Sequence, residues 1–537
     1  MSSPCVTGVS YPLAADWDRD GAYTGTGEDV TDQVPYAEPV TVSWGRDQKR
    51  DLSPVAPGKL TFSLLNTDGR YSPENPSPPL SGAVRVGRMV RWQADNHGVI
   101  TTLFEGPIDS LTVQAERTEA RVDFEALDGF EQRNNANLST RVYATIRTGE
   151  AIAVILDAIA WPADKRDLDY GSTVIPYWWA EDVTAPDAVA QLVASEGPPA
   201  MFFVANGVAT FRDRHHRLTR ARSTDVQATY CVTGIGMDCD PVASPCPTGS
   251  FGYSRPFGYE HGMRDITNVA AFTVSRRARG EAPTEVFSDD LIRAIDDGET
   301  AVIKAASTSD PFVDAITPVA GTDFTVLSGS VTVALTRTSG QSATILVTAT
   351  GGPARISGMH LRATVLAEAN THRAEAIDVA SRDEFGEQRW PNDAPWAQDP
   401  YTAQALADVI VGRGAQPRPI LSLRVVAGDD ATLTEVLSRA VSDRLHVRND
   451  EHYFDDDVHV EFIAHTATRA GSNRPLHITT LGVEKAADPP PAIPFIFDEV
   501  GHGFDDGYFD GNGMSNPETL FIFDEVGHGF DDGKFAL

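Results

Sequence analysis

MFFVANGVATFRDR, at residues 201–214, is the stretch that decides the fold. Apolar side chains alternate on both sides of Asn206-Gly207, which is the residue pair that a type I′ turn requires, so the stretch predicts a β-hairpin. Helical periodicity precedes the hairpin at 148–159 and again at 186–196. Two helices beside a hairpin predict a small α+β domain over residues 136–225.

Short β-strands are indicated on either side of this domain. Residues 1–135 carry alternating apolar runs separated by turn residues, which predicts a β-barrel or sandwich. Residues 226–265 are rich in Gly, Pro and aromatic residues and predict a long loop that reaches a neighbouring protein. Residues 266–375 predict a β-sandwich inserted between two halves of another domain, and residues 376–488 a mixed α/β-β domain. The predicted fold class is multi-domain and mainly β, with α+β parts.

Capping residues indicate where several helices begin. Thr148 is the expected N-cap of the first helix, and Thr402 of a helix that runs to Val411. The sequence TLTE at 432–435 has the pattern of a capping box. The acidic run at 455–457 is expected in a solvated turn.

Residues 489–537 combine a Pro-rich linker with an exact duplication. FIFDEVGHGFDDG occurs at 495–507 and again at 521–533. A copy this short cannot build its own core, so we expect its apolar residues to dock on another chain as a short strand or turn. The residues concerned are Phe495, Phe497, Val500, Phe521, Phe523 and Val526. Packing of the two copies back onto the body is the alternative.

Length and charge limit the possible functions. A chain of 537 residues is too long for one core, and the formal net charge is −32. So acidic a surface repels phosphate backbones, which argues against stable nucleic-acid binding. The acidity serves solubility or lets DNA slide past without sticking. The sequence shows neither a signal peptide nor a membrane span, which predicts synthesis in a cytoplasm.

Catalytic motifs are not evident, and we predict that the protein is not an enzyme. HExxH, GxSxG, Walker and GxGxxG patterns do not occur in a fitting context. The histidine-rich run at 214–217 is expected at an exposed polar corner, because adjacent side chains on a strand point to opposite faces. Cys5, Cys231, Cys239 and Cys246 lack CxxC spacing, which favours free thiols over a disulfide or a metal site.

One segment has the spacing of metal ligands. DWDRDG places Asp16, Asp18 and Asp20 as in the first half of a calcium loop, where alternate oxygens converge on a hard cation. The twelfth position is Gly27, and Glu28 follows one residue late. Ca²⁺ is therefore the one cofactor that the sequence suggests, and an acidic turn between strands is the alternative.

Five segments carry a resemblance to a known family. They are VSYPLAADWDRDGAYTGTGEDVT at 9–31, LLNTDGRYSPENPSPPLSG at 64–82, IPYWWAEDVTAPDAVAQLVASEGPPAMFFVANGVATFRDRHHRL at 175–218, PWAQDPYTAQALADVIVGRGAQPRPILSLRV at 395–425 and LHITTLGVE at 476–484. These segments resemble minor tail proteins of long-tailed phages that infect actinobacteria. Proteins of that family are similar to the baseplate hub of contractile-tailed phages, in which two related β-domains with α/β insertions form a trimeric ring.

The resemblance implies a structural role at the tip of the tail. A hub of this kind lies below the tail tube in the virion, contacts the distal tail protein and the tape-measure protein, and attaches fibres or receptor-binding proteins. It would form a homotrimer around the channel for the tape measure and DNA, and would be assembled in the host cytoplasm. The family offers no catalytic residues to transfer.

Two other functions stay open at this point. A tail-associated cell-wall hydrolase would need a carboxylate pair in a cleft. A glycan-binding or receptor-binding module would need an aromatic platform, for which Trp178, Trp179, Trp390 and Trp396 are candidates. Adjacent Trp178 and Trp179 are expected to divide between core and surface, because neighbouring strand residues point to opposite faces.

Overall fold

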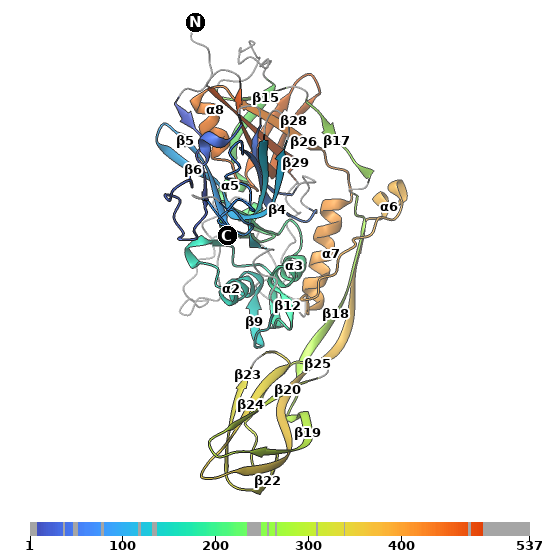
Figure 1. The fold of residues 1–537 in the computed structure, drawn as a ribbon. Helices are drawn as coiled ribbons and strands as arrows, with labels where there is room; N and C mark the ends of the chain where they lie inside the picture. The colour runs from blue at the N-terminus through green and yellow to red at the C-terminus, as the bar shows by residue number, and fades with distance from the viewer. Residues whose placement is uncertain are drawn as a thin grey trace, which may run out of the picture.

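The computed structural model describes residues 8–35, 38–46, 52–76, 80–115, 120–130, 137–232, 249–254, 257–263, 266–307, 310–337, 339–470 and 474–486. Several sheets and few helices make up these residues, so the predicted fold class is confirmed. Figure 1 shows a β-rich body, a small helical unit beside it, and a sandwich at the end of a long two-stranded ribbon. Among the described helices, none has the length and apolar character needed to cross a bilayer.

The N-terminal strands build one half of the body. They are β1 (Val9–Ser10), β2 (Leu13–Asp16), β3 (Val40–Gly45), β4 (Ala56–Leu65), β5 (Met89–Asn96), β6 (Val99–Ala115) and β7 (Ala120–Leu127), with a 3-10 turn, η1, at Thr31–Gln33. β5, β6, β7, β4 and β3 lie side by side in this order. Every second side chain is buried, as Val90, Trp92 and Ala94 are on β5, which is the pattern of a sheet with one face on a core.

The C-terminal strands build the other half. They are β15 (Val226–Val232), β16 (Phe251–Tyr253), β17 (Tyr259–Glu260), β26 (Ile420–Ala427), β27 (Arg444–Asn449), β28 (Phe454–Ala470) and β29 (Arg474–Lys485), with α8 at Asp430–Leu437. β16, β15, β27, β28, β29 and β26 pair in this order. A bridge between Ser254 and Arg424 joins β26 back to the end of β16, so this half closes into a barrel.

The long strand β28 belongs to both halves. Its first residues pair with β27, and its later residues pair with β3, from Phe462 opposite Gly45 to Ala467 opposite Val40. As a result, strands from both ends of the chain form a single 14-stranded sheet. One hydrophobic core is likewise shared between them, with Val42 on one side and Ile463 on the other.

The small α+β unit lies between the two halves in sequence. Its elements are β8 (Asn137–Leu138), β9 (Tyr143–Arg147), α2 (Thr148–Ala158), η2 (Ala163–Lys165), β10 (Arg166–Leu168), β11 (Val174–Trp178), β12 (Val183–Thr184), α3 (Ala185–Glu196), β13 (Met201–Ala205), β14 (Val208–Arg212), α4 (His216–Thr219) and α5 (Ala221–Thr224). The predicted hairpin is confirmed: β13 pairs with β14, and Asn206 and Gly207 both have positive φ.

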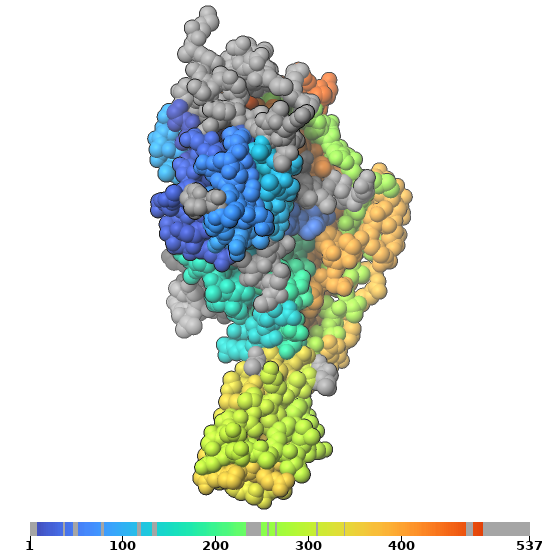
Figure 2. All heavy atoms as spheres, viewed as in Figure 1, coloured from blue at the N-terminus to red at the C-terminus, as the bar shows by residue number. Residues whose placement is uncertain are grey.

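The sandwich is an insertion with its own core. Its strands are β18 (Val269–Arg279), β19 (Thr284–Ile295), β20 (Thr300–Ala306), β21 (Phe312–Ile316), β22 (Thr325–Ser328), β23 (Val331–Arg337), β24 (Ser342–Ala349) and β25 (Ala354–Ile377). β20, β24 and β23 form one sheet, which packs on the sheet of β19, β25, β21 and β22. β18 and the later residues of β25, 366–377, form the ribbon to the body (Figure 1), and Figure 2 shows the sandwich projecting from the rest of the molecule.

Two helices follow the ribbon, α6 (Val379–Phe385) and α7 (Pro400–Gly414). α7 packs along β18 and β25 through small apolar side chains such as Ala403 and Ala407. This contact supports the base of the ribbon against the body.

Several predicted local features are wrong. Arg147 is the N-cap of α2, Asp399 that of α7 and Asp429 that of α8. The carboxylates of Asp399 and Asp429 accept the N–H groups of the residues that the sequence suggested as caps or capping-box residues, Thr402 and Thr432. Each aspartate lies three residues earlier and is the better N-cap.

The acidic run at 455–457 does not form a solvated turn. It lies on β28, where Asp457 binds Arg444 and His446 of the neighbouring strand β27. Cys231 is part of a disulfide, not a free thiol. The other cysteines, Cys5, Cys239 and Cys246, lie outside the described residues.

Candidate functional site

Three buried charged side chains meet where β3, β28 and the small α+β unit join. Arg46 Nη1 lies 2.8 Å from Glu461 Oε2, and Arg217 Nη1 lies 2.6 Å from Glu461 Oε1. Their residues are 1% (Arg46), 0% (Glu461) and 6% (Arg217) exposed. We call these three residues the junction network.

Arg46 extends the junction network to further segments of the chain. Its Nη2 donates to the carbonyl oxygens of Pro199 and Ala200 at 2.9 Å, in the loop between α3 and β13. Its Nε donates to the carbonyl oxygen of Ser53 at 2.7 Å. A guanidinium carries its N–H donors in a rigid fork. These contacts therefore fix three segments around Arg46: the residues near Ser53, the loop between α3 and β13, and β28 at Glu461.

The backbone at this point is built to bring the charges together. The pairing register of β28 shifts between Val460 and Phe462, which places Glu461 in a bulge and turns its side chain into the interior. Gly45 lies opposite with φ +97, and a Cβ atom there would lie 2.3 Å from the carbonyl oxygen of Glu461. That carbonyl accepts the N–H of Arg46 at 2.7 Å. Only glycine allows this approach.

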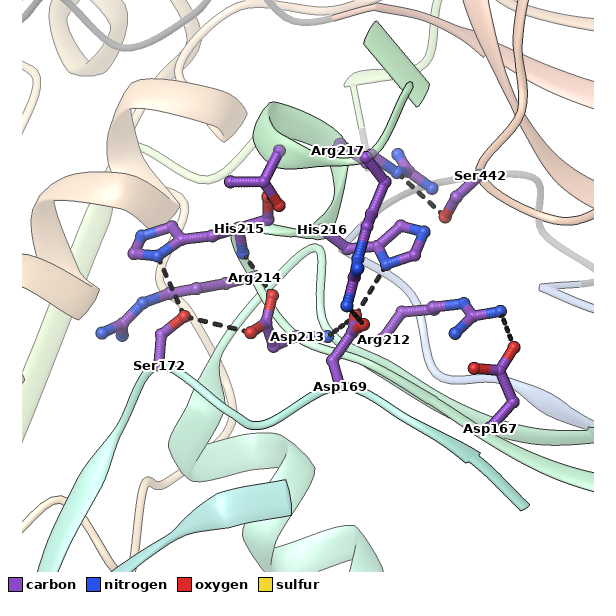
Figure 3. A network of polar contacts seen from close by, with 12 residues as sticks. Asp167, Asp169, Ser172, Arg212, Asp213, Arg214, His215, His216, Arg217 and Ser442 are labelled. Carbon is purple, nitrogen blue, oxygen red and sulfur yellow. Dashed lines mark hydrogen bonds and ion pairs between the residues drawn. The ribbon is translucent and has the colours of Figure 1, made fainter. Parts of the chain in front are cut away.

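A second polar network includes residues next to Arg217 in the chain and is drawn in Figure 3. Asp169 accepts a hydrogen bond from His216 Nδ1 at 2.6 Å and pairs with Arg220 at 2.9 Å. Burial opposes ionisation of Asp169, but the hydrogen bond and charge of His216 outweigh it and lower the pKa to about 2. The run at 214–217 is therefore not the exposed corner that the sequence suggested. The chain turns into α4 after β14 and buries His216 and Arg217.

Ser172, His215 and Asp213 lie together in the same network but do not form a catalytic relay. Ser172 Oγ is 2.9 Å from His215 Nδ1. Asp213 accepts from Ser172 Oγ at 3.4 Å and from the backbone N–H of His215, so its carboxylate does not orient the imidazole. Burial and the charge of Arg214 lower the pKa of His215 to about 4, which makes the ring a weak base.

Glu196, the last residue of α3, ties this helix to α2 and to the segment before β11. This buried carboxylate accepts from Thr148 Oγ1 at 2.6 Å and from the N–H groups of Ser172 and Thr173 at 2.9 Å. Burial raises its pKa, whereas the charge of Arg214 and these hydrogen bonds lower it, and the net shift is downward. All of these groups are engaged in holding the fold.

The acidic loop near the N-terminus groups different carboxylates from those that the sequence suggested. Carboxylate oxygens of Asp16, Asp18 and Glu28 lie within 4.8 Å of one another, and this group does not include Asp20. Glu28 belongs to this group of carboxylates because its carbonyl oxygen accepts the N–H of Ala15, which brings Glu28 beside Asp16. Asp16 and Glu28 each accept two backbone N–H groups. Oxygen ligands of this kind fit Ca²⁺ in chemistry, and the site stays a prediction.

Three of the four tryptophans considered as a platform come together. Trp178 and Trp179 are both buried, so the expected division between core and surface is wrong. Trp179 is covered by the inserted sandwich, through Gly340 and the guanidinium of Arg277 at 5.0 Å. Trp396 contacts both indoles, whereas Trp390 packs against the alanine-rich core beside α7.

The predicted docking residues, Phe495, Phe497, Val500, Phe521, Phe523 and Val526, lie outside the described residues. Half of the predicted loop at 226–265 lies outside them as well, and the described half is not all loop, because it includes β15, β16 and β17 of the body sheet. The junction network was not predicted from the sequence. The available signal was a glutamate within an otherwise apolar run of β28.

Comparison with known proteins gave matches among solved structures alone. No family model matches the chain, and no curated protein matches it. A tail protein from Neisseria meningitidis is 10% identical with a TM-score of 0.45, over 89% of this chain and 97% of that one. A prophage MuSo2 43 kDa tail protein from Shewanella oneidensis is 10% identical with a TM-score of 0.43, over 88% and 98%. A prophage tail protein from Listeria monocytogenes is 9% identical with a TM-score of 0.37, over 88% and 94%.

Proposed function

We propose that this chain is a structural protein of a bacteriophage tail, and that it forms the hub at the tail tip. In this role it joins the end of the tail tube to fibres or receptor-binding proteins and encloses the channel for the tape measure and DNA. The resemblance of five sequence segments to minor tail proteins is the reason to look for the role there.

The observation that carries the proposal is a single β-body, built by strands from both ends of the chain, from which the sandwich projects on its ribbon. We call this body, the 14-stranded sheet and its shared core, the merged body. Strands from both ends of the chain share β28 and one core, and the junction network fixes three segments at their meeting point. Because a buried ion pair often adds little stability relative to well-packed apolar residues, we infer that the junction network serves to specify one geometry. A body of fixed shape with a separately folded sandwich on a ribbon suits a scaffold that holds other proteins in position.

The charge of the chain supports a place beside moving DNA. With 76 acidic and 44 basic residues, the protein as a whole repels phosphate. A ring of three copies would give the channel negative walls, from which DNA would slide away, whereas basic walls would hold it. We propose that the chain forms a homotrimer, and that this trimer contacts the distal tail protein and the tape-measure protein in the virion.

The duplicated C-terminal segment is proposed as the attachment point for fibres. Two identical copies on one linker would raise the effective concentration at a multivalent partner. Removal of residues 490–537 from the phage gene would then give particles without fibres. Particles that keep both their fibres and their infectivity would remove this role.

The function itself is tested by deleting the gene from the phage genome and supplying the chain from a plasmid. We expect particles with defective tail tips without the plasmid, and normal, infective particles with it. Normal tails in the deletion strain would refute the proposal. Release of fragments from purified cell wall by the isolated chain, abolished by one carboxylate substitution, would favour the hydrolase in its place.

A further inference from the structure

A hollow of about 150 Å³ opens where the α+β unit meets the segment that leads into α7. It lies between α3, the residues that follow β11, and Trp396. Its lining consists of three indoles, three small or branched apolar residues, one carboxylate and one amide. These are Trp178, Trp179, Ala180, Glu181, Val183, Ala188, Gln191 and Trp396.

The lining divides into a buried floor and an accessible rim. Trp178, Trp179, Ala180 and Ala188 are buried and form the floor. Glu181, Val183, Gln191 and Trp396 are partly exposed and form the rim. The floor is apolar while the rim carries hydrogen-bonding groups, so a ligand would meet both kinds of surface.

The indoles are held in place by contacts with one another and with α3. Trp179 and Trp396 stand nearly perpendicular, at 85°, with ring centroids 5.1 Å apart. Trp396 Nε1 donates to Gln191 Oε1 at 3.2 Å, and its backbone N–H donates to Ser195 Oγ at 2.9 Å. Walls fixed in this way bind without first losing rotamer freedom.

The polar groups of the rim keep hydrogen-bonding capacity. Glu181 accepts from Ser339 Oγ at 2.8 Å and from the N–H of Gln341 at 3.1 Å, one bond to each oxygen. A carboxylate oxygen has a second lone pair that can accept from a ligand hydroxyl. The amide of Gln191 uses its oxygen for Trp396 and carries two N–H donors besides.

We propose that this hollow binds one pyranose ring of a glycan. A cavity of about this volume accommodates a six-membered ring such as benzene, so the hollow has room for a single ring. Pyranoses present C–H groups on one face and hydroxyls at the edge. Trp396, the one partly exposed indole, takes the face above the floor of Trp178 and Trp179, and Glu181 and Gln191 take the hydroxyls. The inference does not depend on the proposed function, because binding is a property of the purified chain.

The affinity of such a site is modest. A pyranose has about 12 non-hydrogen atoms, and at the ligand efficiency of drug-sized molecules this gives a Kd of about 2 mM. Loss of one indole wall weakens binding by about tenfold.

The experiment uses the full chain and five probes: glucose, galactose, mannose, N-acetylglucosamine and, as a comparison, choline. Binding is measured by saturation-transfer NMR and by titration of tryptophan fluorescence. We expect saturable binding of at least one sugar by the natural chain, weakened by about tenfold in Trp396→Ala and weakened also in Gln191→Ala. Trp390→Ala, which removes an indole outside the hollow, keeps the binding.

Several results would overturn the inference. One is the absence of saturable binding of every sugar by the folded natural chain. Another is binding that neither substitution weakens. Saturable binding of choline with no binding of sugars would assign the hollow to a quaternary ammonium group. Near-UV circular dichroism checks the fold of each variant, and if Trp396→Ala is unfolded, Gln191→Ala decides.

Discussion

Glu461→Gln is the substitution that most directly probes the junction network. It keeps the shape of the side chain but removes the negative charge between two buried guanidinium groups, those of Arg46 and Arg217. The contact with Arg46 is a charge-assisted hydrogen bond, worth about 1.5–3 kcal/mol, and the contact with Arg217 is a second buried ion pair. Leaving a buried charge without its partner costs about 3–5 kcal/mol in other proteins. We therefore expect the free energy of unfolding of the body to fall by about 4 kcal/mol.

Differential scanning calorimetry of the full chain is the assay. The chain has several domains, so the transition of the merged body is followed by itself rather than as one two-state event. A loss of about 4 kcal/mol lowers the Tm of a body of this size by about 8–16 °C. Glu387→Gln is the matched control, because Glu387 pairs with Arg389 on the surface, where such pairs contribute about 1 kcal/mol or less.

A triple substitution tests the same network in the opposite direction. Replacing Arg46, Glu461 and Arg217 together with apolar residues of similar volume should restore much of the lost stability, because no unpaired charge then remains. If Glu461→Gln lowers the Tm no more than Glu387→Gln does, the junction network does not hold the halves together, and the reasoning is refuted.

Three further predictions concern other parts of the chain. Gly45→Ala should destabilise the protein by about 3 kcal/mol, because Gly45 has positive φ and an added Cβ would meet the Glu461 carbonyl. Gly412→Ala in α7 is the control: open space surrounds this glycine, so the substitution should stabilise the protein by up to about 1 kcal/mol. Equal effects of the two substitutions in urea titrations would contradict this prediction. Asp169→Asn should lower stability by about 2 kcal/mol at neutral pH, because the folded-state pKa of about 2 lies below the ordinary value. This contribution is complete above the unfolded pKa and disappears as the pH falls through about 2, so the two proteins should converge in acid; a gap that stays constant from pH 7 to pH 2 would exclude the mechanism. Ca²⁺ at about ten times its Kd should raise the free energy of unfolding by about 1.4 kcal/mol, and Asp18→Asn should abolish the effect; an unchanged Tm of the natural chain in millimolar Ca²⁺ would leave the loop as a turn alone.

Elements with strong local sequence signals could be predicted from the sequence alone. The hairpin around Asn206-Gly207 and the helix that ends before Gly197 follow from residues with few conformational options. The first residues of α7 and α8 were harder to predict, because each helix has two possible N-cap residues three positions apart. Asp399 and Asp429 accept the N–H groups of Thr402 and Thr432, so local sequence alone offered two consistent starts for each helix.

The junction network could not be predicted, because it joins residues that are far apart in the chain. Arg46 and Glu461 are separated by 415 positions. Glu461 lies in a bulge that shifts the alternation of β28, so periodicity does not mark it as inward-facing. The run at 214–217 was misjudged for a related reason: the strand was assumed to continue, whereas the chain turns into α4 and buries two side chains.

The grouping at the acidic loop depended on pairing rather than spacing. Counting along a calcium loop left Glu28 one residue late, but the hydrogen bond between Ala15 and Glu28 brings its carboxylate beside Asp16 and Asp18. A ligand set built across two paired segments has no fixed spacing in the sequence.

Electron cryomicroscopy of intact phage tails tests the central proposal most directly. The account predicts three copies of the merged β-body around the channel below the tail tube, each with its sandwich on the outward ribbon. Tails whose tip density has no place for that body, or purified particles from which the chain is missing, would contradict it.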